Sequence, residues 1–207
     1  SGRRNAASVS LAIKDYRGEE ELKRIYSDSA PELVTGIGML HIQHDTSTPY
    51  QSQTNAVAER TIRLILDGTR TALDSAGLGT VWWPRAARHF CHARNFEKRG
   101  GQSAWYARHH FDFKGMQIPF GALVDVRPPA PELKKLPKFG ARTVPGILLG
   151  WHLAPGAHWR GEYYVAPAAD FEKKSKTKKV RIWRVGELVV EKDAPGHCPH
   201  RERRDDE

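Results

Sequence analysis

The chain has 207 residues, 39% of them hydrophobic and 28% charged, which are ordinary values for a globular protein of one medium or two small domains. Its formal net charge of +9 favours a polyanionic partner, either nucleic acid or an anionic membrane surface. The sequence has no apolar run of membrane-spanning length and no signal-peptide pattern. Two widely separated cysteines, Cys91 and Cys198, argue against a disulfide scaffold. We therefore expect an intracellular protein.

The first part of the chain alternates helical and extended patterns. A helix is expected to end at Gly18, and an apolar–polar alternation predicts a strand that ends at Ser27 and Asp28. The elements predicted in order are a helix over 11–16, a strand over 22–26, a helix over 30–34 and a strand over 39–43. A polar loop follows over 45–55, because this stretch is rich in Thr, Ser, Gln and Pro.

A long amphipathic helix is predicted between Asn55, a good N-cap, and Gly77. Spacings of three and four residues put one set of charged side chains on a single face. This face consists of Glu59, Arg63, Asp67, Arg70 and Asp74, and the opposite stripe consists of Val57, Thr61, Leu64, Ile65, Gly68 and Ala72. A second helix is predicted over 84–95, with Pro84 in its first turn.

The composition changes near Gly100. Residues 100–118 mix Gly, His and aromatic side chains and are predicted to form a linker. Short β-like runs separated by Pro, Gly and Lys predict a small all-β unit, a barrel, over 119–193. The tail over 194–207 is predicted to be disordered.

Asp28 and Glu59 are the candidate metal-binding carboxylates. Asp28 follows a predicted strand, and Glu59 lies in the first turn of a predicted helix, where the helix dipole favours the ionised form that a metal ligand requires. Two carboxylates from separate elements suit metal-dependent phosphodiester chemistry. The alternative, equally open on these grounds, is that Asp28 opens a turn and Glu59 pairs with Arg63.

Several other side chains are candidates for contacts with nucleic acid. The polar loop offers Tyr50, Gln53 and Asn55, and the following helix offers Arg60 and Arg63. These groups suit phosphate contacts and stacking on an unpaired base, whereas the alternatives are a plain polar loop and a solvated charged face. The lysine-rich run over 173–181 suits phosphate contacts or a nuclear-import signal, and a solvated loop is as good an interpretation.

A sequence motif between residues 27 and 60 resembles the integrase of copia-type LTR retrotransposons. The motif comprises Ser27-Asp28-Ser29-Ala30-Pro31-Glu32-Leu33, His44, Thr48-Pro49-Tyr50, Gln53, Asn55 and Val57-Ala58-Glu59-Arg60. The match continues through Trp83 and Ala93-Arg94-Asn95, and then through Pro119-Phe120-Gly121, Pro145-Gly146-Ile147-Leu148-Leu149-Gly150-Trp151 and Tyr163-Tyr164-Val165. Together these segments cover most of residues 20–192.

The resemblance implies an α/β fold, with part of an RNase H-like integrase core over 1–99 and an SH3-like barrel over 119–193. It implies that Asp28 and Glu59 are the second and third members of a D,D,E catalytic triad that binds two Mg²⁺ or Mn²⁺ ions. It places Tyr50, Gln53 and Asn55 in the active-site loop, and Arg60 and Arg63 on a DNA-binding helix. The implied partners are the DNA ends of the retroelement and the target DNA. The implied active form is a homo-oligomer, and the implied location is the nucleus.

The sequence also departs from this family. The first Asp of the triad and the zinc module are expected upstream and are not in this chain. The spacing from Asp28 to Glu59 is shorter than usual, and Ser29 and Ala56 replace the usual Asn and Gly. We therefore expect the chain alone to lack strand-transfer activity. The alternatives are a nucleic-acid-binding remnant of a retroelement polyprotein without chemistry, and a decayed reading frame.

Overall fold

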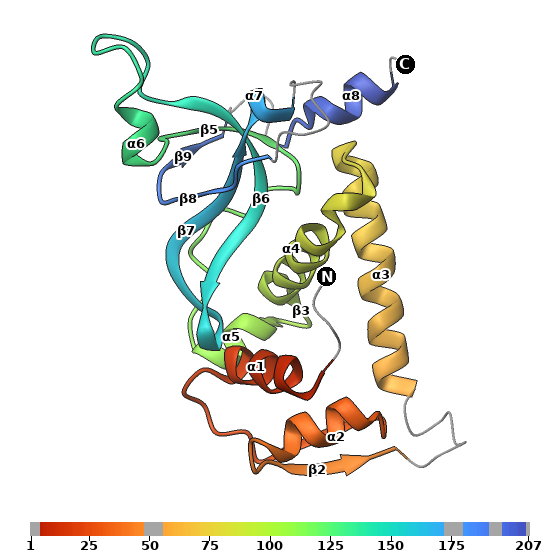
Figure 1. The fold of residues 1–207 in the computed structure, drawn as a ribbon. Coiled ribbons are helices and arrows are strands. Elements are labelled where there is room, and N and C mark those ends of the chain that lie inside the picture. Colours follow the sequence, from red (N-terminus) through yellow and green to blue (C-terminus); the bar gives the residue numbers. More distant parts are fainter. Residues whose placement is uncertain (1–4, 48–55, 172–179, 191–195, 206–207) are drawn as a thin grey trace. The chain divides into compact units, whose positions relative to one another are not determined.

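The computed structural model describes residues 5–47, 56–171, 180–190 and 196–205. It divides into two compact units. The first comprises Ser1–Leu64 with Leu153–Arg160, and the second comprises Ile65–His152 with Gly161–Glu207. Helices and strands occur in both units, which confirms a mixed α/β composition (Figure 1).

The first unit is a β–α–β arrangement preceded by a helix. Its elements are α1 (Ala6–Arg17), β1 (Arg24–Ser27), α2 (Pro31–Gly38) and β2 (Gln43–Thr46). The Asn5 side chain caps α1 by accepting a hydrogen bond from the Ser8 amide at 2.8 Å. Strands β1 and β2 pair in parallel from Arg24 opposite Gln43 to Ser27 opposite Thr46. The parallel pairing requires a crossover, and α2 supplies it.

Two glycines permit close packing in this unit. A Cβ atom at Gly36 in α2 would lie 2.7 Å from the Ala6 carbonyl oxygen and 2.8 Å from the Val9 Cβ atom. A Cβ atom at Gly18 would lie 2.6 Å from the Cα atom of Gly156. Gly18 also has a φ of 59° after the last turn of α1, so a glycine is favoured there on both grounds.

The second predicted strand of this unit lies later in the chain than expected. We predicted it over 39–43, but β2 begins at Gln43 because α2 continues to Gly38. The turn that follows contains His41 with a φ of 54°, and Ile42 is buried. The apolar residues interpreted as a strand therefore form the end of a helix and a turn.

The long helices agree with the sequence prediction. They are α3 (Ala56–Ala76) and α4 (Trp83–Phe96), joined through the 3₁₀ turn η2 (Thr80–Trp82). Gly77 follows α3 with a φ of 66°, the left-handed conformation that commonly ends helices. Helix α3 begins in the first unit and ends in the second.

Only the second half of α3 buries its apolar stripe. Gly68 faces the Phe90 ring of α4 so closely that an added Cβ atom would overlap the ring. Ala76 is fully buried, and Ala72 and Leu73 pack against the same cluster. In the first half of the helix Val57, a member of the predicted stripe, is 72% exposed. The amphipathic pattern therefore serves for packing against α4 and the core cluster only in the later turns.

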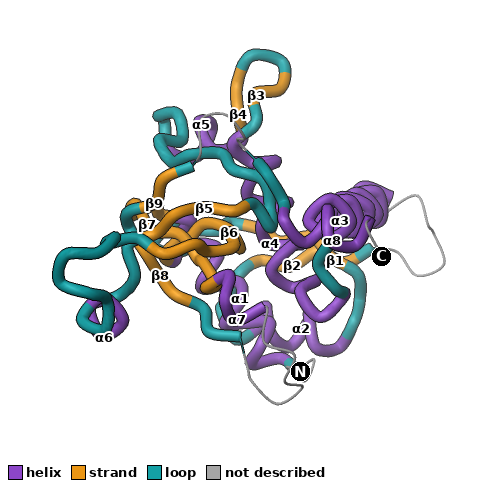
Figure 2. Tube along the Cα trace, turned by 90° about the horizontal axis from the view of Figure 1, so that it is seen from above, coloured by secondary structure: helices purple, strands orange, loops and turns teal. Residues whose placement is uncertain are grey.

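The second unit contains a curled sheet of five strands in the order β8-β7-β6-β5-β9 (Figures 1 and 2). The strands are β5 (Leu123–Val126), β6 (Val144–Ala154), β7 (His158–Pro167), β8 (Trp183–Val185) and β9 (Leu188–Val189). The pairs β5–β6, β5–β9 and β7–β8 are antiparallel. Burial alternates along β5, where Val124 and Val126 are buried, whereas β6 is buried at every residue from Gly146 to Trp151. Each predicted β-like run therefore overlaps one strand of this sheet.

Short helical segments connect the strands. They are α6 (Ala130–Leu133) between β5 and β6, η3 (Pro155–Ala157) between β6 and β7, and α7 (Ala168–Phe171) after β7. Within β6, Gly150 has a φ of 127° and lies beside His89 of α4. A side-chain-bearing residue would be strained in this conformation.

Residues 100–118 are not an irregular linker. They follow β3 (Lys98–Arg99) and contain β4 (Gln102–Ser103) and α5 (Ala104–His109). The Phe113 ring stacks on Phe96 with centroids 3.6 Å apart, and Trp105 packs edge-on against Phe96 at 5.3 Å. Trp151 of β6 completes this aromatic cluster. The segment is ordered because its aromatic side chains bury against α4 and the sheet.

The tail after residue 196 is also structured in part. Helix α8 covers Pro199–Asp205, where disorder was expected. The His197 carbonyl accepts a hydrogen bond from the Leu123 amide at 2.8 Å, and the backbone of α8 approaches Gly77 so closely that a Cβ atom there would overlap it. Contacts with distant parts of the second unit therefore order this helix.

Both cysteine thiols are free and half-buried. Burial raises the pKa of Cys91 and that of Cys198. The Cys198 Sγ atom lies 3.3 Å from the Gly196 carbonyl oxygen and 3.8 Å from that of Phe120. His200, two residues further on, packs its ring against Phe171 at 4.8 Å. The His-Cys-Pro-His sequence is thus used in packing.

We predict that Gly68→Ala destabilises the second unit, because the new methyl group would overlap the Phe90 ring. Overpacking costs about 1–3 kcal/mol, and the better helix propensity of Ala returns at most about 1 kcal/mol. Thermal unfolding followed by circular dichroism would show a lower Tm. Gly79→Ala is the matched control, since nothing lies within 4 Å of its added Cβ atom. Equal melting of Gly68→Ala and the native chain would contradict the close packing of α3 on α4.

We also predict acid destabilisation of the second unit through His89. Burial lowers the pKa of His89 to about 4, although its Nε2 atom contacts the Ile118 carbonyl oxygen at 2.9 Å, and burial has the same effect on His92. The unfolded chain therefore binds protons first as the pH falls below 6.5. Each histidine then costs up to about 1.4 kcal/mol per pH unit until the folded pKa is reached.

Urea unfolding at a series of pH values, followed by tryptophan fluorescence, would measure this slope. His89→Gln removes one titrating group and should flatten the decline between pH 6.5 and 4. His110→Asn, which removes an exposed histidine, is the matched control. A native-like slope in His89→Gln would show that His89 does not couple folding to pH.

Candidate nucleic-acid interface

Asp28 lies directly after β1, at the carboxyl end of the parallel pair β1–β2. Its side chain is exposed, and Oδ1 accepts a hydrogen bond from the Ala30 amide at 3.3 Å. This contact is an Asx-type turn that leads the chain into α2. Ligands of α/β proteins bind in the crevice beyond the carboxyl ends of parallel strands. The fold therefore places this carboxylate at a position where charged ligands are commonly held.

Side chains around Asp28 hold this strand end in place. The Ser27 Oγ atom lies 2.9 Å from His44 Nε2, and the Ser47 amide donates to the Ser27 carbonyl at 2.9 Å. Ser29 Oγ donates to the Ser47 carbonyl at 3.5 Å. The ends of the two strands are thus tied to each other on both sides of the carboxylate.

Glu59 and the two candidate arginines project from the beginning of α3. Glu59 lies in the first turn and is exposed, as are Arg60 and Arg63. Arg60 Nε donates to the Ala56 carbonyl at 3.2 Å. Arg70, further along the helix, pairs with Asp67 at 2.8 Å. The beginning of α3 therefore presents cations that are not neutralised by a described carboxylate, whereas its middle carries a balanced pair.

The alternative interpretation of Glu59 was an ion pair with Arg63, and the structure does not show this pair. In the described part of the chain Glu59 and Arg63 form no ion pair. Asp28 does open a turn, so that part of the alternative holds, but its carboxylate remains exposed and keeps further acceptor capacity. Both carboxylates are thus accessible to an external ligand.

The structure places Asp28 and Glu59 in the same compact unit. The chain passes from β2 to α3 through residues 48–55, and the predicted site residues Tyr50, Gln53 and Asn55 lie outside the described residues. Among the residues described, no three side chains of His, Cys, Asp or Glu gather as a metal-binding group. Two oxygen ligands fit Mg²⁺, which usually keeps several waters and is held by one or two carboxylates.

One interpretation of the basic run over 173–181 was contact with phosphates, and Arg181 at its end does not fit that interpretation. Its lysines lie outside the described residues, but Arg181 is placed and is neutralised. Arg181 contacts Asp170 twice, from Nε at 2.8 Å and from NH2 at 3.0 Å, and Glu132 at 3.3 Å. The hydrogen bonds to Asp170 raise the pKa of Arg181. Its guanidinium is therefore committed to carboxylates and is a poor candidate for phosphate.

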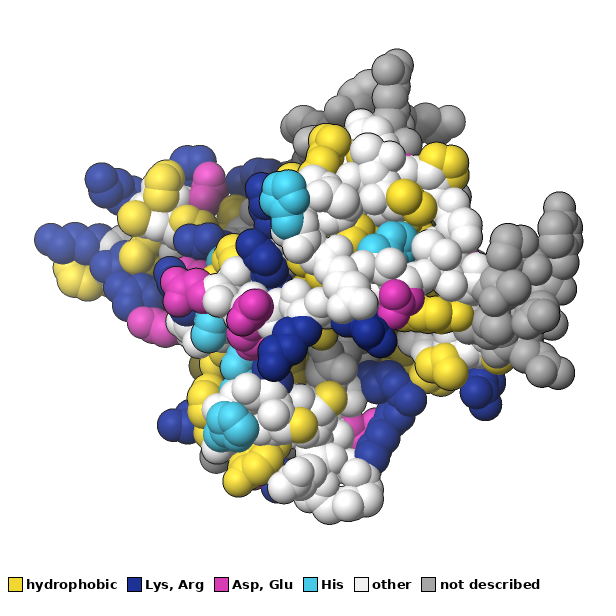
Figure 3. Space-filling view, turned by 90° about the horizontal axis from the view of Figure 1, so that it is seen from below, with side chains coloured by type: hydrophobic (Ala, Val, Ile, Leu, Met, Phe, Trp, Pro, Cys, Tyr) yellow, Lys and Arg dark blue, Asp and Glu magenta, His cyan; other side chains and the backbone are white. Residues whose placement is uncertain are grey.

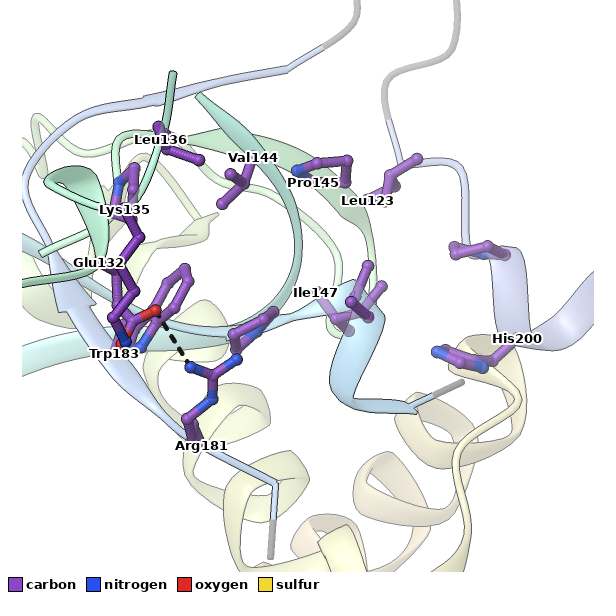
Figure 4. Close-up of a pocket in the computed structure, with 15 residues that line it drawn as sticks. Leu123, Glu132, Lys135, Leu136, Val144, Pro145, Ile147, Arg181, Trp183 and His200 are labelled. Carbon is purple, nitrogen blue, oxygen red and sulfur yellow. Dashed lines mark hydrogen bonds and ion pairs between the residues drawn. The ribbon is translucent and has the colours of Figure 1, made fainter. Parts of the chain in front are cut away.

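Arg181 belongs to the wall of a pocket of about 550 Å³ in the second unit (Figure 4). Most of the remaining wall is apolar and includes Leu136, Ile147 and Trp183. The Glu132–Arg181 ion pair lies beside Trp183, on the side of the pocket opposite His200 (Figure 4). The pocket combines apolar walls with a neutral ion-pair network.

Arg85 in the first turn of α4 is a further cation that was not predicted from the sequence. Its guanidinium carbon lies 4.5 Å from the centre of the Tyr164 ring, and Nη1 is buried without a hydrogen-bond partner among the described residues. The sequence showed only an arginine after Pro84 on an amphipathic helix. Its contact depends on β7, which is distant in sequence, so no local pattern could have indicated it.

Basic side chains are numerous on the surface, but many of them have acidic partners. On the face drawn in Figure 3, Lys and Arg side chains lie over much of the surface, with acidic side chains among them. Several cations among the described residues belong to exposed ion pairs, such as Arg24 with Asp45 at 3.2 Å and Lys98 with Asp112 at 2.9 Å. The cations without an acidic partner are therefore the better candidates for contacts with phosphate. No helix in the described part of the chain is long and apolar enough to cross a membrane.

Comparisons with known proteins give little further information. No protein-family model matches the sequence, and no curated protein matches it. Among solved structures, a chain in the cryoEM structure of the simian T-cell lymphotropic virus intasome in complex with PP2A regulatory subunit B56 gamma is similar at 16% identity. The match covers 96% of this chain and 67% of that chain, with a TM-score of 0.41. A likeness this distant carries no argument about function.

Proposed function

We propose that this chain is part of a copia-like retroelement integrase and binds DNA, with Asp28 and Glu59 as two of its metal-binding carboxylates. One observation carries the proposal. Asp28 directly follows a strand of a parallel pair and Glu59 lies in the first turn of α3, and both stay exposed within one unit. Together with the motif around these two residues, this arrangement supports their assignment to one site.

We assign residues 1–99 to part of an RNase H-like core and residues 119–193 to an SH3-like barrel. The crossover from β1 through α2 to β2, followed by α3, supports the first assignment. The curled sheet of five strands supports the second. Residues 100–118 connect them, with the helix and aromatic packing described above.

Asp28 and Glu59 are the residues that would hold the metal. When bound, Mg²⁺ or Mn²⁺ would neutralise charge on a phosphodiester and favour an in-line displacement by water or a 3′-hydroxyl. The chain itself supplies ionised oxygen ligands. Glu59 lies at the positive end of the α3 dipole, which favours its carboxylate form. Asp28 is oriented by the Ala30 amide and is fixed at a strand end.

Arg60 and Arg63 would contact phosphates of the DNA. Both lie within four residues of Glu59 on the exposed part of α3. Since neither pairs with a carboxylate in the described structure, contact with DNA would not require an existing ion pair to break. Phosphate contacts of this kind give affinity without sequence preference.

A second candidate function is DNA binding without chemistry. The observation that favours it is that, among the described residues, no three side chains of His, Cys, Asp or Glu gather as a metal-binding group. Two ligands organise a metal site less well than three, so the positions of attacking and leaving oxygens would be poorly fixed. This candidate retains the contacts of Arg60 and Arg63 and removes only the reaction.

We predict that Arg60→Ala combined with Arg63→Ala weakens DNA binding and flattens its salt dependence. Each lost phosphate contact should lower the slope of log K against log salt by about one. Fluorescence anisotropy with a blunt duplex over a series of salt concentrations would measure both effects. Arg70→Ala is the control on the same helix, because Arg70 is already paired with Asp67. An unchanged slope in the double variant would remove α3 from the interface.

We further predict that the purified chain shows no Mg²⁺- or Mn²⁺-dependent strand transfer. The expected cause is incomplete metal coordination, since the chain offers two carboxylates where the family uses three. Gel analysis of labelled donor and target DNA would detect joined products. Strand transfer that is abolished by Glu59→Gln would show that the two carboxylates suffice. DNA binding without product would favour the second candidate function.

A further inference from the structure

The connection between β5 and β6 contains a defined turn. After α6 the chain continues through a basic segment, and the Gly140 amide donates to the Pro137 carbonyl at 3.1 Å. This is the hydrogen bond of a four-residue β-turn, in which Phe139 holds the third position and glycine the favoured fourth. The turn therefore fixes an aromatic residue at the tip of the connection. We name residues 134–143 the finger.

Phe139 is almost completely exposed. Its side chain is 95% accessible, the highest value among the large hydrophobic residues that the structure describes. The neighbouring Lys138 Nζ atom lies 5.6 Å from the centre of the ring. Exposure of an apolar phenyl ring to water is unfavourable in free energy. The exposure therefore leaves the ring available for an external partner.

The finger is positively charged. It contains Lys134, Lys135, Lys138 and Arg142 and no acidic residue. Lys135 pairs with Glu132 at 2.8 Å, but the other three cations form no ion pair in the described structure. The finger thus combines one free aromatic face with three free cations, which is the composition that binds single-stranded nucleic acid.

The base of the finger is held by ion pairs and by packing. Glu132 of α6 contacts Arg181 at 3.3 Å, and Arg181 is held by Asp170. The hydrogen bond from Lys135 lowers the pKa of Glu132, and Arg181 adds to this effect. Leu136 lines the apolar pocket, as Figure 4 shows. The tip therefore projects from an anchored base, which reduces the entropy lost when a ligand binds.

We propose that the finger stacks Phe139 on an unpaired base of a DNA strand while Lys138 and Arg142 contact the flanking phosphates. The choice of DNA rests on the proposed function above, whereas the stacking rests on the finger alone. Bases inside a duplex are stacked on one another and offer no free face, so the proposal is specific for unpaired ends. A membrane surface is a weaker fit, because the tip offers a single large apolar side chain.

The experiment measures the anisotropy of labelled DNA with the whole chain. The probes are a blunt duplex, the same duplex with a single-stranded thymidine overhang, and that overhang with abasic sites. The native chain should bind the thymidine overhang at least about five-fold more tightly than the other two probes. Phe139→Ala should lose this difference, and Phe139→Trp should keep it.

Two further comparisons separate stacking from charge. Phe139→Ala should leave the salt slope unchanged, whereas Lys138→Ala with Arg142→Ala should lower it by about two. Val81→Ala, which also removes an exposed apolar side chain in the second unit, should bind all probes like the native chain. Because Phe139 is so exposed, the variant should melt like the native chain, and circular dichroism would verify this.

Three results would overturn the proposal. One is native affinity of Phe139→Ala for the thymidine overhang, and another is equal affinity of the native chain for the thymidine and abasic overhangs. The third is loss of binding to phosphatidylserine vesicles in Phe139→Ala without any change on DNA, which would assign the finger to membranes. Failure of the α3 variants to alter blunt-duplex binding would contradict the proposed interface and leave the overhang preference intact, so the two tests are distinguishable.

Discussion

The contact between Gly68 of α3 and the Phe90 ring of α4 is the constraint on which the packing of the second unit most depends. It lets the later turns of α3 approach α4, and it joins them to the core cluster around Ala76 and Phe120. The same helix continues to its first turn, which carries Glu59 and Arg60. A side chain at residue 68 would therefore weaken the anchoring of the later turns of α3 in the second unit.

Local sequence patterns predicted those elements whose ends are determined by residues nearby in the sequence. Helices α3 and α4 were predicted closely, because amphipathic spacing and bounding Gly or Pro residues determine both. The start of β2 was misplaced, since α2 is extended by the packing of Gly36 on α1. The segment over 100–118 and helix α8 were missed for a related reason. Their order comes from aromatic and backbone contacts with residues far away in the sequence.

The candidate site shows the same division between local and long-range information. The positions of Asp28 at a strand end and Glu59 in a first turn followed from the sequence, and the structure contains both. Their proposed role comes from the motif. The neutralisation of Arg181 was not predictable, because its partners Asp170 and Glu132 lie in separate elements. A count of basic residues therefore overstated the cations that are free to bind DNA.

The two half-buried cysteines bear on how the chain can be labelled. Thiolates react with alkylating reagents, and burial raises the pKa of both Cys91 and Cys198, which lowers their thiolate fraction. A cysteine introduced at an exposed position such as Val81 lacks this burial and should react faster. A dye can thus be directed to a chosen exposed position with the two natural cysteines as the slower sites.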